Sequence, residues 1–279
     1  RYRKTPINNE SLLIAISQSG ETADTLAAIK KAKKHDALTM GIVNVVGSSI
    51  ARETDCGIYM HAGPEIGVAS TKAFTTQLIA LGALTLFMAN FNKTMRRNEI
   101  NKLSNALLEA PGQISKILKM DNIFHKTAIS IKNAKNVLYI GRGTNYPVAL
   151  EGALKLKEIS YIHAEGYPAG EIKHGPIALI EKGVPVIVIA PSDNLIDKTI
   201  SNVEEVLSRG AEIIFISDKK GIKKINNKKI TTICLPETHE LISPILYSVP
   251  VQLIAYHTAV LKGTDVDQPR NLAKSVTVE

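Results

Sequence analysis

Blocks of apolar residues followed by polar turns and amphipathic stretches run along the chain, a pattern typical of strands that alternate with helices. The first block is Leu12 to Ile16, an unbroken apolar run that favours a strand buried on both faces of a parallel sheet. The polar stretch Ser17 to Thr22 follows, and then a helical pattern from Ala23 to Lys34. Such a turn is suited to hold an anion, because free backbone N–H groups and the positive end of a helix dipole meet there. The alternative is an ordinary helix N-terminus capped by serine or threonine.

The same order of strand, turn and helix recurs further along the chain. Strands are predicted at 39–45, 57–60, 137–140, 184–190, 212–216 and 230–235. Helices are predicted at 72–89, 148–161 and 243–262, with another that ends at Arg209. The region 94–134 is expected to be helical throughout, with an interruption at Pro111 and Gly112.

Two parts of the chain repeat each other. Residues 58–80 align with residues 233–255 at a shift of 175 residues, and Leu12 to Ile16 fall on Val186 to Ala190 at a shift of 174. This predicts a tandem duplication of one α/β unit. The second copy opens well before its matching strand, so we expect the first copy to begin about 40 residues before Arg1.

The repeat predicts an α/β fold with two tandem domains, each built on a parallel sheet. The first domain is expected at 1–93, without its N-terminal strand, helix and strand, and a helical connector at 94–134. The second domain is expected at 135–264, followed by a C-terminal tail at 265–279.

Composition and charge exclude several classes of protein. The residues are 44% hydrophobic and 22% charged, as in globular proteins. No run of about 18 apolar residues predicts a membrane span and no signal sequence opens the chain, so we expect a cytoplasmic location. The net charge of +8 favours anionic ligands, but no nucleic-acid-binding motif accompanies it, so neither nucleic acid nor membrane is expected as a partner. Cys56 and Cys234 are expected to be small core residues, and no metal site is predicted.

The second copy carries most of the titratable side chains that could take part in catalysis. Glu151, Lys155 and Glu158 share one face of a predicted helix, where they suit proton transfer or, alternatively, form a ladder of ion pairs on a wet surface. His174 lies in a Gly- and Pro-rich segment, 163–176, which we expect to be a loop. Lys274 lies in the tail and matters only if the tail folds over a site.

One glycine motif points away from a dinucleotide cofactor. Gly141 and Gly143 resemble half of a dinucleotide-binding fingerprint, but the third glycine position is Tyr146. No acidic residue ends a following strand at the required distance either. Nicotinamide and flavin cofactors are therefore not expected, and no other cofactor is predicted.

Five segments in this order resemble the family of isomerising glutamine–fructose-6-phosphate aminotransferases. The five are 17–22, 65–72, 151–158, 171–176 and the tail from Asp265 to Glu279. The resemblance implies two SIS (sugar-isomerase) domains, each a flavodoxin-like αβα sandwich. The N-terminal glutaminase of that family is absent from this chain, as are the first strand and loop of the first SIS domain.

The resemblance also implies roles for individual residues. In this family the residues matching Ser17, Gln18, Ser19 and Thr22 hold the sugar phosphate, and those matching Val68, Ala69, Ser70 and Ala273 line the sugar site. Glu158 matches the base that moves a proton between C1 and C2, with Lys155 as its electrostatic neighbour. His174 matches a ring-opening histidine supplied by the neighbouring subunit of a homodimer. Lys274, in a tail folded over the active site, matches the lysine that forms a Schiff base with the open-chain ketose.

The function implied is conversion of fructose 6-phosphate and ammonia to glucosamine 6-phosphate. The ammonia would come from glutamine through the glutaminase domain of the full-length enzyme. The alternative is a regulatory SIS module that binds a sugar phosphate without catalysis. That module would need the Ser17 to Thr22 loop but not Glu158, His174 and Lys274 together, so their joint presence favours the enzyme.

Overall fold

The computed structural model describes residues 3–225, 227 and 229–277. The chain forms two compact units. One comprises Arg1–Thr85 together with Asn271–Glu279, and the other comprises Leu86–Arg270. The C-terminal tail therefore returns to the unit that contains the start of the chain.

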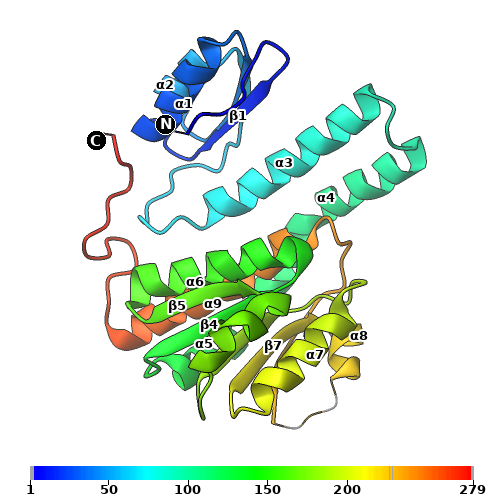
Figure 1. The fold of residues 1–279 in the computed structure, drawn as a ribbon, viewed down its shortest axis with the longest axis vertical. Coiled ribbons are helices and arrows are strands. Elements are labelled where there is room, and N and C mark those ends of the chain that lie inside the picture. Colours follow the sequence, from blue (N-terminus) through cyan, green and yellow to red (C-terminus); the bar gives the residue numbers. More distant parts are fainter. Residues whose placement is uncertain (1–2, 226, 228, 278–279) are drawn as a thin grey trace. The chain divides into compact units, whose positions relative to one another are not determined.

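The first unit is built on three parallel strands in the order β1 (Leu12–Ser17), β2 (Leu38–Val43) and β3 (Cys56–Tyr59). The helices α1 (Ala23–Lys33) and α2 (Ser49–Glu53) lie beside this sheet (Figure 1). A small core joins Ala15 and Val43 of the sheet to Ile29 of α1 and Ile50 of α2. Alternate residues of β1 thus face these helices, as expected for a strand with side chains on both faces.

The opposite face of β1 is open to solvent within this unit. Leu12, Ile14 and Ile16 are 42%, 37% and 41% exposed. The corresponding residues of the second sheet, Ile187 and Ile189, are almost fully buried. Over the residues that the structure describes, the sheet of the first unit has three strands and that of the second has five.

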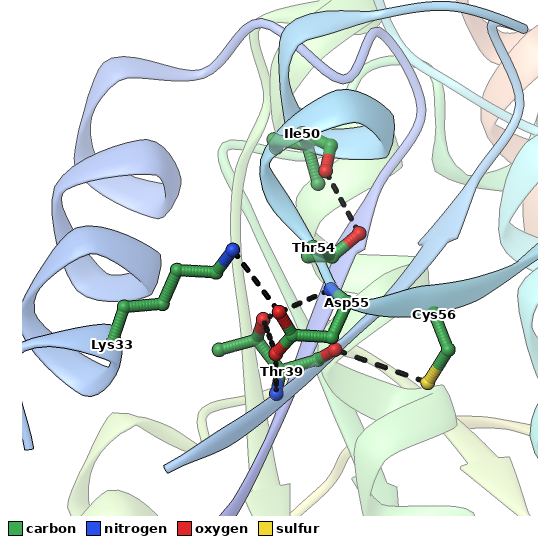
Figure 2. Close-up of polar contacts among 6 residues, drawn as sticks. All are labelled: Lys33, Thr39, Ile50, Thr54, Asp55 and Cys56. Carbon is green, nitrogen blue, oxygen red and sulfur yellow. Dashed lines mark hydrogen bonds and ion pairs between the residues drawn. The ribbon is translucent and has the colours of Figure 1, made fainter. Parts of the chain in front are cut away.

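A polar cluster ties the beginnings of β2 and β3 together (Figure 2). The Asp55 carboxylate accepts hydrogen bonds from the Thr39 backbone N–H at 2.9 Å and the Thr39 hydroxyl at 2.8 Å. The Lys33 ammonium, from the end of α1, lies 3.1 Å from the same carboxylate. These hydrogen bonds and the nearby ammonium lower the pKa of Asp55 from 3.8 to about 2. The cluster lies at the opposite end of the strands from the Ser17 to Thr22 loop and is structural.

The second unit is a three-layer α/β sandwich around a five-stranded parallel sheet (Figure 1). The strand order is β5-β4-β6-β7-β8, with bounds His163–Pro168, Asn136–Gly141, Pro185–Ile189, Glu212–Asp218 and Thr231–Leu235. On one face α6 (Tyr146–Ser160) packs against α9 (Ser243–Lys262). The other face is covered by α7 (Ile196–Leu207) and the short helix η2 (Ala169–His174), with α8 (Lys219–Lys224) beside β7 and β8. The predicted α/β fold with parallel sheets is confirmed.

Two short helices, η1 (Gly143–Asn145) and η3 (Pro176–Leu179), and three longer ones complete the described chain. The longer ones are α3 (Lys72–Phe91), α4 (Arg97–Leu118) and α5 (Asp121–Ile131); α4 and α5 pack on α9 within the second unit. The predicted interruption at Pro111 and Gly112 is wrong, because α4 runs through both residues and ends at Leu118. Both residues are exposed, so water can replace the hydrogen bond that proline cannot donate.

The segment 163–168 is a strand and not the predicted loop. It forms β5 and pairs with β4 in parallel along its whole length. Gly166 approaches the backbone of α6 so closely that a Cβ would lie 2.9 Å from Leu150. The glycine and proline that suggested a loop are thus explained by close packing on α6 and by the edge position of the strand.

The two sheets confirm the internal repeat but correct its register at the first strand. The order and direction of β1, β2 and β3 match those of β6, β7 and β8. Leu12 pairs with Leu38, and Pro185 pairs with Glu212, so Leu12 falls on Pro185 at a shift of 173 and not 174. The start of α1 at Ala23 and of α7 at Ile196 agrees with 173.

Both cysteines are exposed, so the expected core placement is wrong. Cys56 and Cys234 lie on β3 and β8, which are edge strands of their sheets over the residues that the structure describes.

Two described helices, α3 and α9, are long and apolar enough to cross a membrane by length and composition alone. In α9, 72% of the most apolar window is buried inside the structure, as in a core helix, whereas the figure for α3 is 22%.

Candidate functional site

The loop predicted to hold an anion connects β1 to α1 and is shaped by its own hydrogen bonds. The Ser17 hydroxyl is buried and accepts the backbone N–H of Gly20 at 2.9 Å. Gly20 has a φ of +72°, and a Cβ there would lie 2.0 Å from the Ser48 hydroxyl. Only glycine fits this position without displacing Ser48. Ser17 and Gly20 therefore set the shape of the loop.

The Glu21 side chain joins the loop to the beginning of α2, where its carboxylate is hydrogen bonded. Its carboxylate accepts the backbone N–H of Ser49 at 2.8 Å, at the beginning of α2. Hydrogen bonds from Ser49 lower the pKa of Glu21. Thr22 is the N-cap residue of α1, but its hydroxyl makes no capping hydrogen bond to the helix.

The C-terminal tail folds onto this loop within the same unit. The Ser275 and Ser19 hydroxyls lie 3.1 Å apart, and the backbone N–H of Ala23 donates to the Val276 carbonyl at 3.2 Å. The first N–H of α1 thus contacts the tail. Ala273 is exposed.

The ammonium of Lys274 donates to the carbonyl of Gly67. This glycine directly precedes Val68, Ala69 and Ser70, the predicted wall of the sugar site. The Glu65 carboxylate holds that wall by accepting the Ser70 hydroxyl at 3.2 Å and the Ala73 N–H at 2.8 Å. Three segments that are distant in sequence therefore meet in the first unit: the Ser17 to Thr22 loop, the wall and the tail.

The second unit brings Glu151, Lys155 and Glu158 together on α6. The Lys155 ammonium lies 2.6 Å from the Glu158 carboxylate, and the lysine side chain is almost fully buried. Glu151 is buried as well, so the three residues do not form a wet surface ladder. A buried lysine beside a carboxylate is an arrangement suited to proton transfer.

Burial raises the pKa of Glu151, while the Lys155 charge and a hydrogen bond from the Gln252 amide oppose that rise. Close packing explains the burial. Gly152 lies between Tyr139 of β4 and Val251 of α9, and a Cβ there would meet both within 2.9 Å. The glycine allows α6 to approach the sheet and α9 closely.

His174 stands apart from these residues. It is the last residue of η2 and is exposed to solvent. Among the described residues, no hydrogen bond or ion pair of its side chain is found.

The second unit also has a loop in the position of the Ser17 to Thr22 loop, but its character is acidic. Ser192, Asp193, Asp218 and Glu240 line a pocket of about 280 Å³ at the ends of β6 and β7. Asp218 accepts the backbone N–H of Ser192 at 2.8 Å, of Lys220 at 2.9 Å and of Gly221 at 3.0 Å. The Asp218 carboxylate therefore occupies the backbone N–H groups that would otherwise be available to bind an anion.

Sequence reasoning missed several residues of these clusters. Glu65, Gly67, Ser275 and Gln252 were not predicted as site residues. Glu65 carried a weak signal, because the repeat aligns it with Glu240. The contacts of Gly67, Ser275 and Gln252 join distant parts of the chain and leave no local pattern.

Comparison with known proteins supports the resemblance along the whole chain. The SIS domain family matches residues 1–87 and 130–262. Glutamine–fructose-6-phosphate aminotransferase [isomerizing] of Brucella abortus is 55% identical over 279 residues, which are 100% of this chain and 46% of that protein. The aminotransferase of the same name from Zymomonas mobilis is 54% identical over the same share of each chain. This chain thus spans about half the length of these relatives.

Solved structures agree with these matches. The C-terminal domain of glucosamine-fructose-6-phosphate aminotransferase from Francisella tularensis superposes with a TM-score of 0.94 at 45% identity, over 96% of this chain and 76% of that chain. Glucosamine-6-phosphate deaminase from Thermotoga maritima superposes with a TM-score of 0.74 at 25% identity, over 98% and 77%. The resemblance predicted from five motifs is confirmed, and the chain belongs to the SIS domain family.

Proposed function

We propose that this chain is the isomerase part of an enzyme that makes glucosamine 6-phosphate from fructose 6-phosphate and ammonia. The observation that carries the proposal is the placement of Lys274 in the first unit. Its ammonium contacts Gly67 while the adjacent Ser275 contacts Ser19. A lysine amine beside a loop suited to phosphate is the arrangement needed to form an imine with a phosphorylated ketose.

In the proposed reaction Ser19 and Thr22 donate hydrogen bonds to the sugar phosphate, together with Gln18. His174 opens the sugar ring by proton transfer. The Lys274 amine then attacks the C2 carbonyl, and water leaves as the imine forms. Ammonia displaces the lysine at C2, and Glu158 moves a proton from C1 to C2, which leaves the amino group on C2 and an aldehyde at C1.

A second subunit and a glutaminase domain would take part in the proposed reaction. His174 would serve the site of the neighbouring subunit in a homodimer, which is consistent with its exposed position at the end of η2. The names of the Brucella and Zymomonas relatives support glutamine as the ammonia source, through a glutaminase domain outside this chain. We expect the protein to act in the cytoplasm without a cofactor.

The proposal is tested by assaying the full-length protein for interconversion of fructose 6-phosphate and glucose 6-phosphate, with and without ammonium. We expect interconversion without ammonium, and glucosamine 6-phosphate when ammonium is supplied. A protein that binds fructose 6-phosphate but converts it to neither product would contradict the proposal and favour a regulatory binding module.

A further inference from the structure

A buried amide on α9 contacts the carboxylate cluster of α6. The Gln252 amide nitrogen donates to the Glu151 carboxylate at 3.2 Å, and both residues are only 8% exposed. The two residues are 101 positions apart and meet because α6 and α9 lie side by side in the second unit (Figure 1). Val251, next to Gln252, packs against Gly152, next to Glu151. The position of the amide is therefore fixed by the packing of the two helices.

The charges around Glu151 come mainly from its own helix. Lys155 supplies the favourable charge and Glu158 an unfavourable one, while α9 contributes the neutral Gln252. From the sheet, β4 presents Tyr139, whose hydroxyl is buried and uncharged. The other titratable side chains of α9 are Tyr247, Tyr256, His257 and Lys262, and His257 is paired with Asp121 of α5 at 2.7 Å. Apart from Lys155, the described donor to Glu151 is thus a neutral amide.

Removal of that amide would change how Lys155 is shared. With Glu151 ionised, the single ammonium of Lys155 is attracted by two carboxylates. Burial raises the pKa of Glu151, and the Gln252 hydrogen bond opposes this rise. If Glu151 became neutral, Lys155 would be attracted by Glu158 alone, so the ion pair that joins them at 2.6 Å would be stronger and Glu158 would accept a proton less readily.

We propose that Gln252 is a positioning residue that holds the Glu151 carboxylate in place on α6, so that the charge of Lys155 is shared between two carboxylates and Glu158 keeps its ability to accept the substrate proton. This inference rests on the proposed function, because it assumes that Glu158 is the base. Gln252 itself touches no reacting atom in this account.

The test is the pH dependence of fructose 6-phosphate isomerisation by the full-length protein and its Gln252→Met variant. Methionine keeps the length and bulk of glutamine but donates no hydrogen bond. Because Glu151 would then stay protonated to higher pH, we expect the acidic limb of the kcat profile to move up by about one pH unit, with about tenfold lower kcat on that limb. KM should change little.

Glu151→Gln provides the matched background. If Gln252 acts through the charge of Glu151, Gln252→Met should cause no additional loss in a Glu151→Gln protein. An equal loss at every pH and in both backgrounds would overturn the inference, since that result indicates a merely structural role. An unchanged profile in Gln252→Met would overturn it too. If Gln252→Met does not fold, as judged by thermal melting, Gln252→Leu is tested in the same two backgrounds.

Failure of the proposed function gives a different result. Glu158→Gln is measured in parallel. If it retains normal turnover, the assignment of the base is wrong, and the inference about Gln252 is overturned with it. If Glu158→Gln is inactive while Gln252→Met has the wild-type profile, only the inference about Gln252 fails.

Discussion

At the scale of single residues, Glu158 is placed for its proposed work by Lys155, which lies 2.6 Å away and is almost fully buried. Glu158→Gln keeps the shape of the side chain but removes its ability to accept a proton. We expect turnover to fall about 10²–10⁴-fold while fructose 6-phosphate still binds. Solvent exchange of the C1 proton, followed by NMR in deuterium oxide, measures the step directly. The control is Lys157→Gln, at an exposed position of the same helix. Near-normal exchange in Glu158→Gln would contradict the role of Glu158 as base and indicate that it serves only in an ion pair with Lys155.

Asp55 gives a prediction about stability far from that chemistry (Figure 2). Because its pKa falls from 3.8 to about 2 on folding, its stabilising contribution is present in full above about pH 3.8 and is lost as the pH falls toward 2. Asp55→Asn should therefore lower the melting temperature at pH 5, and the difference from the wild type should shrink near pH 2. Thermal melting across this range checks it, with the exposed Asp267→Asn as control. A difference that is the same at both pH values would contradict the assignment.

At the scale of elements, the two equivalent loops of the repeat predict a single phosphate site per chain. The loop after β1 offers Ser19 and Thr22, whereas the loop after β6 is occupied by its own carboxylates, Asp193 and Asp218. Ser19→Ala and Thr22→Ala should each weaken fructose 6-phosphate binding by roughly tenfold or more, because hydrogen bonds to a charged group are worth about 1.5–3 kcal/mol.

Calorimetry tests both parts of this prediction. We expect one fructose 6-phosphate bound per chain. Ser192→Ala, at the position equivalent to Ser19 in the second unit, should leave the affinity unchanged. Two sites per chain, or equal losses from Ser19→Ala and Ser192→Ala, would show that the acidic loop also binds phosphate.

Strands with a continuous apolar pattern could be predicted from the sequence. A strand that contains glycine and proline for reasons of tertiary packing could not. The strands β6 and β7 were predicted within two residues at each end, because they are buried on both faces. The strand β1 was placed as well from its unbroken apolar run, but the predicted burial on both faces is wrong within its unit, where Leu12, Ile14 and Ile16 are exposed. The strand β5 was missed, since Gly166 and Pro168 are read locally as breakers, while their reason lies in packing on α6 and at the sheet edge. The contact of Lys274 with Gly67 spans 207 residues and has no local signal. Only the resemblance to a family pointed to it.

In the molecule as a whole, residues 264–277 at the C-terminal end contribute contacts to each of the two units. Residues 264–270 are held in the second unit, where the Thr264 hydroxyl donates to the Ile159 carbonyl at 2.6 Å and the Arg270 N–H donates to the Tyr161 hydroxyl at 2.9 Å. Residues 271–277 belong to the first unit and contact the predicted phosphate loop. Within the first unit, the position of Lys274 is therefore set by the contacts of the last described segment, 271–277.

In the proposed reaction Lys274 forms an imine with the open-chain sugar. The most direct measurement is borohydride reduction of the full-length protein in the presence of fructose 6-phosphate, followed by peptide mapping with mass spectrometry. We predict one reduced adduct, on Lys274, that disappears in Lys274→Arg and without the sugar. Adducts spread over surface lysines, or no adduct at all, would contradict the account.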